Sequence, residues 1–84
     1  MYELADYVAM LADRRRVEAY LAAMRAVIRR GDRVVELGTG FGYFAVHAAK
    51  LGAEHIWAVE PADAVALGPE IAALNGVADR ITFV

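Results

Sequence analysis

The sequence predicts an α/β fold built on a small parallel sheet. Three short segments rich in β-branched or aromatic residues, 33–37, 55–60 and 81–84, alternate with segments of helical composition. Strands that alternate with helices in this way are typical of parallel sheets. Further helical segments precede the first strand, and alanine supplies much of the 60% hydrophobic content, which favours helices.

Length and composition exclude several classes of protein. The chain has 84 residues, fewer than the usual domain of about 100 to 150 residues, so it can bury one modest core. Cysteine is absent, which excludes a disulfide framework and thiolate metal ligands. No apolar run approaches the ~20 residues of a membrane span, and no signal-peptide pattern is visible. The formal net charge of −2 gives no general attraction to nucleic acid, and we expect a cytoplasmic protein.

Two helices are expected before the first strand. The first covers residues 3–11, and Asp13 can cap the amino end of the second. We expect this second helix to continue through Arg29 and Arg30, whose charges suit a helix carboxyl end, and to close at Gly31. Its apolar side chains recur at three- and four-residue steps and form one stripe. They are Val17, Tyr20, Leu21, Met24, Val27 and Ile28.

Glycine and proline positions indicate the remaining boundaries. Pro61 ends the second strand, because proline cannot continue a central ladder. Gly68-Pro69 interrupts the next helical segment, so we expect a loose turn before a helix that starts at the proline. The expected order is a strand over 33–37, a helix over 41–51, a strand over 55–60, a turn over 62–67, a helix over 69–74 and a strand over 81–84.

The residues that carry chemistry surround a glycine-rich loop. Gly38, Gly40 and Gly42 follow directly on the first strand, where glycine permits a positive φ and lets a ligand approach the backbone. The following helix is expected to present free N–H groups and a positive dipole end to that ligand. Glu60 stands at the carboxyl end of the second strand, the edge at which open α/β sheets bind ligands, and can accept both hydroxyls of a ribose.

Two ligands compete for this layout, and a glycine turn without a ligand is the third interpretation. A dinucleotide fingerprint, G-x-G-x-x-G, requires glycine where this chain has Tyr43. Glu36, two residues before Gly38, is unusual for a dinucleotide site and suits a ligand with a cationic part. S-adenosylmethionine carries both an ammonium and a sulfonium group, so this methyl donor is favoured over NAD.

Residues 34–42, Val-Val-Glu-Leu-Gly-Thr-Gly-Phe-Gly, resemble motif I of the class I S-adenosylmethionine-dependent methyltransferases. Residues 58–60 resemble the acidic end of the second strand in that family, and residues 75–81 resemble the entry to its third strand. The resemblance implies a partial Rossmann-like methyltransferase fold. Residues 1–84 would be the donor-binding part of a truncated domain, with N-terminal helices over 1–31 and the β-α-β-α-β half over 32–84.

The segment before motif I points to a subgroup. Met10-Leu11-Ala12-Asp13, with Arg16 and Tyr20, is similar to the corresponding stretch of the protein arginine methyltransferases. Tyr7 is a departure, because that group commonly has histidine three residues before the methionine. The paired glutamates with which that group grips arginine lie beyond the third strand, so the acceptor, a protein or a small molecule, is left open.

Carried over by position, the resemblance implies a set of contacts with S-adenosylmethionine. The backbone of the glycine loop, Thr39 included, would line the methionine and ribose part of the donor. Glu60 would bind the ribose hydroxyls, and its replacement by alanine is expected to weaken donor binding at little cost in folding. Arg16 would pair with the donor carboxylate, Met10 would lie near the sulfonium and adenosine, and Glu36 would meet the amino group.

The expected function is an S-adenosylmethionine-dependent methyltransferase, of which this chain supplies the donor half without the acceptor site or a general base. Two alternatives are a non-catalytic donor-binding or regulatory module and an NAD-type dinucleotide-binding fragment. His47 and His55 lack a neighbouring pattern of ligands, so no metal site is expected. Because the first strand would keep a free edge, we expect a homo-oligomer or pairing with the missing remainder of the domain, through residues 33–37 and the second helix.

Overall fold

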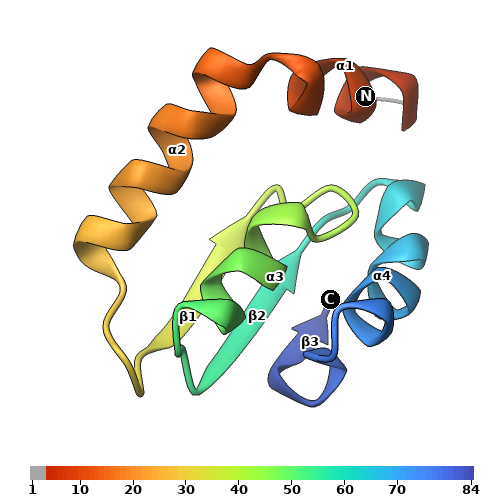
Figure 1. Ribbon diagram of the computed structural model, residues 1–84. Helices are drawn as coiled ribbons and strands as arrows, with labels where there is room; N and C mark the ends of the chain where they lie inside the picture. The colour runs from red at the N-terminus through yellow and green to blue at the C-terminus, as the bar shows by residue number, and fades with distance from the viewer. Residues whose placement is uncertain (1–3) are drawn as a thin grey trace.

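The computed structural model describes residues 4–84, so residue 3 of the predicted first helix lies outside the described part. Helices, three strands and two short 3₁₀ turns follow one another along the chain (Figure 1). They are α1 (Leu4–Ala12), α2 (Arg14–Val27), β1 (Arg33–Leu37), α3 (Tyr43–Lys50), β2 (His55–Val59), η1 (Asp63–Leu67), α4 (Gly68–Leu74), η2 (Ala78–Arg80) and β3 (Ile81–Phe83).

The three strands form one parallel sheet in the order β1-β2-β3, which confirms the predicted fold class. Arg33 pairs with His55 and Leu37 with Val59, so β1 and β2 are in register over their whole length. β1 is therefore an edge strand, with β2 on one side and no strand of residues 4–84 on the other.

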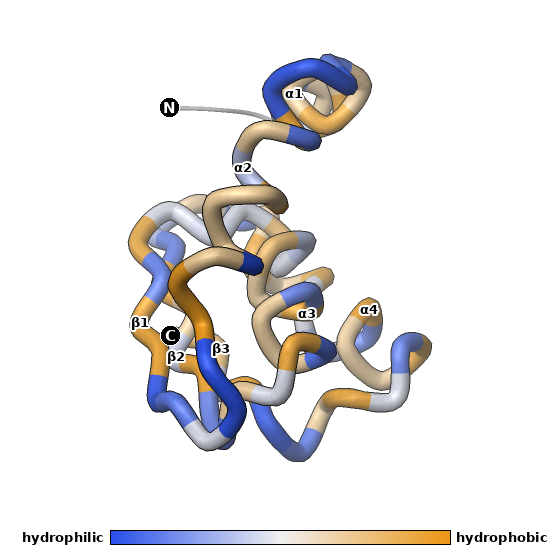
Figure 2. The backbone as a smooth tube through the Cα atoms, turned by 60° about the vertical axis from the view of Figure 1, so that its left-hand side comes forward, coloured by the Kyte–Doolittle hydropathy of each residue, from blue (hydrophilic) through white to orange (hydrophobic). Residues whose placement is uncertain are grey.

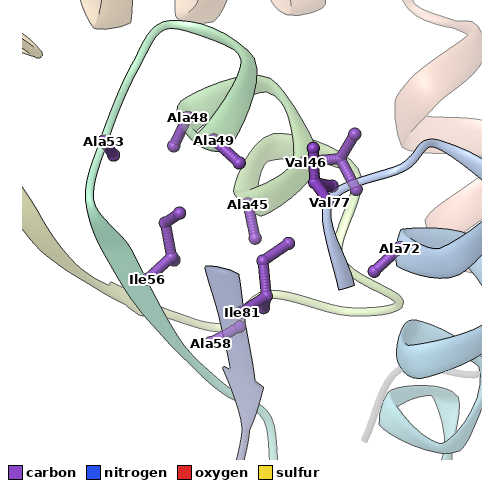
Figure 3. Packing of buried hydrophobic residues seen from close by; sticks show 10 residues of the cluster. All are labelled: Ala45, Val46, Ala48, Ala49, Ala53, Ile56, Ala58, Ala72, Val77 and Ile81. Carbon is purple, nitrogen blue, oxygen red and sulfur yellow. The ribbon is translucent and has the colours of Figure 1, made fainter. Parts of the chain in front are cut away.

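One face of the sheet packs against α3 and α4 and holds the core. Ile56 and Ala58 from β2 are fully buried, and Ile81 from β3 lies beside them (Figure 3). The helix side is built mostly from alanine, with Ala45 exposed by 1% and Ala49 by 0%. Small side chains let a helix lie close to the sheet, which compensates in part for the small size of this core.

The opposite face of the sheet is largely open. Val35, Leu37 and Val84 are exposed by 64%, 80% and 63%. Towards the amino ends of the strands, the Arg33 guanidinium lies 5.1 Å from the centre of the half-buried Trp57 ring. Figure 2 shows hydrophobic stretches along the strands, whereas the turns that precede them are mainly hydrophilic. This face and the free edge of β1 therefore leave apolar side chains uncovered.

Two helix boundaries differ from the predictions by two residues or more. α2 ends at Val27, earlier than expected, because the Asp32 carboxylate accepts the Arg29 N–H at 2.8 Å and holds a turn there. Gly31 has the expected positive φ of 88°, but within this turn. α3 starts at Tyr43, two residues later than predicted, because Gly42 before it has a φ of 93°.

The segment between β2 and β3 follows the prediction closely. The expected loose turn is the 3₁₀ turn Asp63–Leu67, and α4 carries Pro69 in its first turn, where a missing N–H costs nothing. The Phe83 ring of β3 packs back against the glycine loop. An ideal Cβ on Gly42 would lie 2.8 Å from this ring, and one on Gly68 would clash with the same ring.

Candidate functional site

A cavity of about 420 Å³ opens at the carboxyl ends of β1 and β2. Figure 1 places α1 and the start of α2 on the side of the sheet toward which these strands point. β1 and the glycine loop contribute Glu36, Leu37, Gly38 and Thr39 to the cavity wall, and Glu60 follows β2. The predicted site therefore coincides with a cavity at the expected edge of the sheet.

Glu60 connects the glycine loop to the segment after β2. Its Oε1 accepts the Gly40 N–H at 2.9 Å, and its Oε2 accepts the Ala62 N–H at 3.1 Å. The residue is only 7% exposed but still lines the cavity. Each carboxylate oxygen can accept a second hydrogen bond, so Glu60 can still receive the hydroxyls of a ligand. The structure contradicts the expectation that its loss costs little in folding, since two buried amides would lose their acceptor.

Glu36 is the second carboxylate of the cavity. The Thr39 hydroxyl donates to its Oε1 at 2.5 Å. Burial raises the pKa of Glu36 above its ordinary value, the hydrogen bond from Thr39 lowers it, and the negative charge of Glu60 raises it. Two carboxylates around one cavity favour a ligand with positive charge, because a cation offsets both the burial and the mutual repulsion.

The helices bring Arg16 and Met10 to the cavity. Asp13 caps α2 as predicted: its carboxylate accepts the Arg16 N–H at 3.2 Å and places Arg16 in the first turn. Arg16 and Met10 both line the cavity, with Arg16 on the helical side and the two glutamates at the strand ends. The cavity thus offers a cation at one wall and anions at the other.

The three glycines of the loop have different places in the structure. All have a positive φ, as predicted for glycine in such a loop. Gly38 lines the cavity with open space beside its Cα. Gly40 lies under the Tyr7 ring and Gly42 under the Phe83 ring, and neither reaches the cavity wall. The structure therefore brings six of the eight predicted residues together, and these two glycines shape the loop instead.

The N–H groups of the loop are mainly used within the protein. The amides of Gly38 and Thr39 both donate to the Val59 carbonyl, at 2.9 and 3.0 Å. The Gly40 amide donates to Glu60, and the Gly42 amide donates to the Thr39 carbonyl at 3.0 Å. The expectation of free N–H groups concerned the helix after the loop, and it fails only at Gly42, the first of these amides that belongs to the predicted helix.

Sequence reasoning missed the aromatic lining of the cavity. The centroids of the Tyr20 and Phe44 rings are 4.6 Å apart, and Tyr7 meets Phe41 edge-on at 6.2 Å. The helical spacing could have revealed part of this wall, because Tyr7 lies one turn before Met10. The lining residues outside the predicted set are Tyr7, Leu11, Val17, Tyr20, Leu37, Phe41, Tyr43, Phe44 and Pro61.

Both histidines lie away from the cavity. The His47 ring packs 4.8 Å from Tyr43, and His55 Nε2 lies 2.7 Å from the Thr82 hydroxyl. Within residues 4–84, no three histidine, aspartate or glutamate side chains are grouped as metal ligands. The same residues contain no helix long and apolar enough to cross a membrane.

The fold and the cavity together define a class. A parallel sheet in the order β1-β2-β3, a glycine loop after β1 and an acid after β2 are the parts of a Rossmann-like methyltransferase fold. The chemistry around the cavity also fits S-adenosylmethionine. Arg16 matches a carboxylate, Glu36 matches an ammonium and Glu60 matches a ribose diol.

Comparisons with known proteins agree with this class. Residues 17–84 match the family described as ribosomal protein L11 methyltransferase (PrmA), and the chain belongs to this methyltransferase family. Protein arginine N-methyltransferase PRMT10 of Oryza sativa subsp. japonica is 38% identical over 77 residues, which cover 89% of this chain and 20% of that protein. The chain thus spans about a fifth of the length of this curated relative.

Two solved methyltransferase structures have the same fold as this chain over almost its whole length. The crystal structure of PRMT6 with SAH has a TM-score of 0.91 and 26% identity, and the match covers 98% of this chain and 24% of that one. The Trypanosoma brucei PRMT1 enzyme-prozyme heterotetrameric complex with AdoHcy has a TM-score of 0.86 and 31% identity, with 93% and 25% covered. The fold predicted from the sequence is confirmed as a partial methyltransferase fold.

Proposed function

We propose that the chain binds S-adenosylmethionine in the cavity and forms the donor half of a methyltransferase. The observation that carries the proposal is the meeting of Arg16, Glu36 and Glu60 around one cavity beside the glycine loop. The bound donor would supply a methyl group on a sulfonium, which a nucleophile accepts. The chain's own residues would bind and orient the donor, and orientation is a major source of catalysis in such transfers.

Each charged group has one part of the donor to recognise. Arg16 would pair with the carboxylate of the methionine part, because a guanidinium binds carboxylates with two parallel hydrogen bonds. Glu36, already held by Thr39, would face the ammonium group, and Glu60 would accept the ribose hydroxyls with its remaining lone pairs. The two carboxylates at the cavity wall support the methyl donor over NAD, since they would repel an anionic pyrophosphate.

Calorimetric titration tests the choice of ligand. We expect the chain to bind S-adenosylhomocysteine and to show no binding of NAD at the same concentrations. Glu36→Gln should weaken the binding of S-adenosylmethionine, whereas Glu54→Gln, the same change at an exposed residue outside the cavity, should leave it unchanged. Binding of NAD without binding of S-adenosylhomocysteine would contradict the proposal and support the dinucleotide alternative.

We also propose that the acceptor is a protein side chain. The support is the agreement of two groups of relatives, described as protein arginine and ribosomal protein L11 methyltransferases, in acting on proteins. The test is incubation of the complete protein with methyl-labelled S-adenosylmethionine and a ribosomal protein fraction. Label in protein supports the proposal. Donor binding without transfer of label would instead identify a non-catalytic donor-binding module.

The free edge of β1 and the open face of the sheet suggest how the donor half is completed. We propose that these surfaces pair with the remainder of the domain or with a second copy of the chain. Val35 and Leu37 are largely exposed there, and an apolar edge strand is a template for pairing with another strand. The heterotetrameric assembly of the Trypanosoma brucei relative gives further support.

A further inference from the structure

α1 reaches the glycine loop through Tyr7. An ideal Cβ on Gly40 would lie 2.8 Å from Cδ1 and 2.9 Å from Cε1 of the Tyr7 ring, so the ring is directly against the Gly40 backbone. The same ring meets Phe41 edge-on, with centroids 6.2 Å apart and an interplanar angle of 70°. Tyr7 therefore covers the middle of the loop, and it also lines the cavity.

The Gly40 peptide is also hydrogen-bonded to Glu60, a residue of the donor site. The Gly40 N–H donates to Glu60 Oε1 at 2.9 Å, and Gly40 has a φ of +61°. Glycine has more conformational freedom than any other residue, so its backbone needs outside contacts to keep one orientation. The Gly40 peptide lies between an aromatic ring from α1 and a carboxylate that follows β2.

We propose that Tyr7 is a positioning residue for the donor site, which it influences through Gly40 and Glu60. The ring keeps the Gly40 N–H directed at the carboxylate, and this hydrogen bond orients the remaining lone pairs of Glu60 toward the cavity. α1 is thereby coupled to the ribose end of the site. The inference rests on the proposed function in one respect, since it assumes that Glu60 meets the ribose.

A purely structural role for Tyr7 makes different predictions. If the ring only anchored α1, its removal would loosen the helix and leave the Gly40–Glu60 hydrogen bond unchanged. If the ring positions Gly40, its removal should increase the opening of that one hydrogen bond, even without a ligand. Hydrogen exchange of single amides measures such local opening.

The experiment uses the full chain labelled with ¹⁵N-glycine, which contains seven glycines and gives a simple amide spectrum. Gly40 is the reporter, and Gly76, whose N–H donates to the Ala73 carbonyl at 3.0 Å, is the internal control. The variants are Tyr7→Ala, Tyr7→Phe, which keeps the ring, and Val8→Ala. Val8 is a matched control because it lies next to Tyr7 on α1 and is 55% exposed.

We expect Tyr7→Ala to accelerate exchange at Gly40 but not at Gly76, and to weaken S-adenosylhomocysteine binding by about three- to tenfold, the value of one hydrogen bond. Tyr7→Phe and Val8→Ala should resemble the wild type in both measurements. Equal acceleration at Gly40 and Gly76, or a Tyr7→Phe variant that behaves like Tyr7→Ala, would overturn the inference. If the wild type does not bind S-adenosylhomocysteine, the proposed function fails, and the exchange of Gly40 alone decides the role of Tyr7.

Discussion

Replacement of Glu60 should affect both folding and donor binding. The carboxylate accepts the Gly40 and Ala62 amides, and the residue is 7% exposed, so water cannot easily replace it. Each buried amide that loses its acceptor costs about 1 to 3 kcal/mol. Glu60→Ala should therefore lower the free energy of unfolding by roughly 2 to 4 kcal/mol, since partial relaxation will recover some of the sum.

Glu60→Gln is the matched variant for this prediction. Its amide oxygen can accept one of the two N–H groups, while its NH₂ group faces the other without an acceptor. We expect Glu60→Gln to lower the free energy of unfolding by about half as much as Glu60→Ala. It should also lose about half as much donor affinity as Glu60→Ala, because one acceptor is lost in each case. Urea denaturation gives the first quantity and titration with S-adenosylhomocysteine gives the second.

Two outcomes for these variants would contradict the prediction. If Glu60→Ala unfolds at the same urea concentration as the wild type, the two amides do not depend on the carboxylate. If both variants are destabilised but bind S-adenosylhomocysteine normally, Glu60 is a structural residue of the loop and does not contact the ribose.

Four further predictions concern the loop, the charges and the free edge. Gly40→Val should prevent donor binding, because a β-branched side chain at a φ of +61° is strained and would meet the Tyr7 ring; normal calorimetric binding would show that the loop is adaptable. Donor affinity should increase as the pH rises from about 4.5, because the raised pKa of Glu36 leaves it partly protonated there and the cationic donor requires the carboxylate; Glu36→Gln should remove this dependence. Burial, with the charges of neighbouring cations, lowers the pKa of His47, so stability should fall as the pH drops below about 6.5. His47→Gln should therefore reduce the difference in unfolding temperature between pH 5 and pH 7.5, measured by thermal denaturation. Val35→Lys on the open sheet face should reduce self-association in sedimentation experiments at micromolar concentration, and a wild-type chain that is monomeric with cooperative unfolding would contradict the proposed pairing.

Much of the fold could be predicted from local patterns. β1 was predicted with its observed bounds, since a short β-rich run between a charged turn and glycines has few alternatives. The cap at Asp13 and the first-turn position of Pro69 follow from backbone hydrogen bonding, which acts within a few residues. These features depend on near neighbours in the sequence.

The details that were missed depend on contacts between distant segments. The direction of the Gly38 amide is set by the Val59 carbonyl, on the neighbouring strand. The burial of Gly40 under Tyr7 requires α1 to fold back across the sheet edge, which no periodicity in α1 reveals. The two acids of the cavity could be predicted because they end neighbouring parallel strands, but the use of Glu60 as an acceptor for the loop could not.

The Phe83 ring has a consequence for how this family can vary. It packs against two glycines, Gly42 and Gly68, that lie far apart in the chain but meet the same edge of the ring, at Cε1 and Cζ. An alanine at position 68 would need a smaller residue at position 83, whereas position 42 would stay restricted by its φ of 93°. In related sequences, residues 68 and 83 should therefore covary in size, while glycine at 42 should persist whichever pair is present.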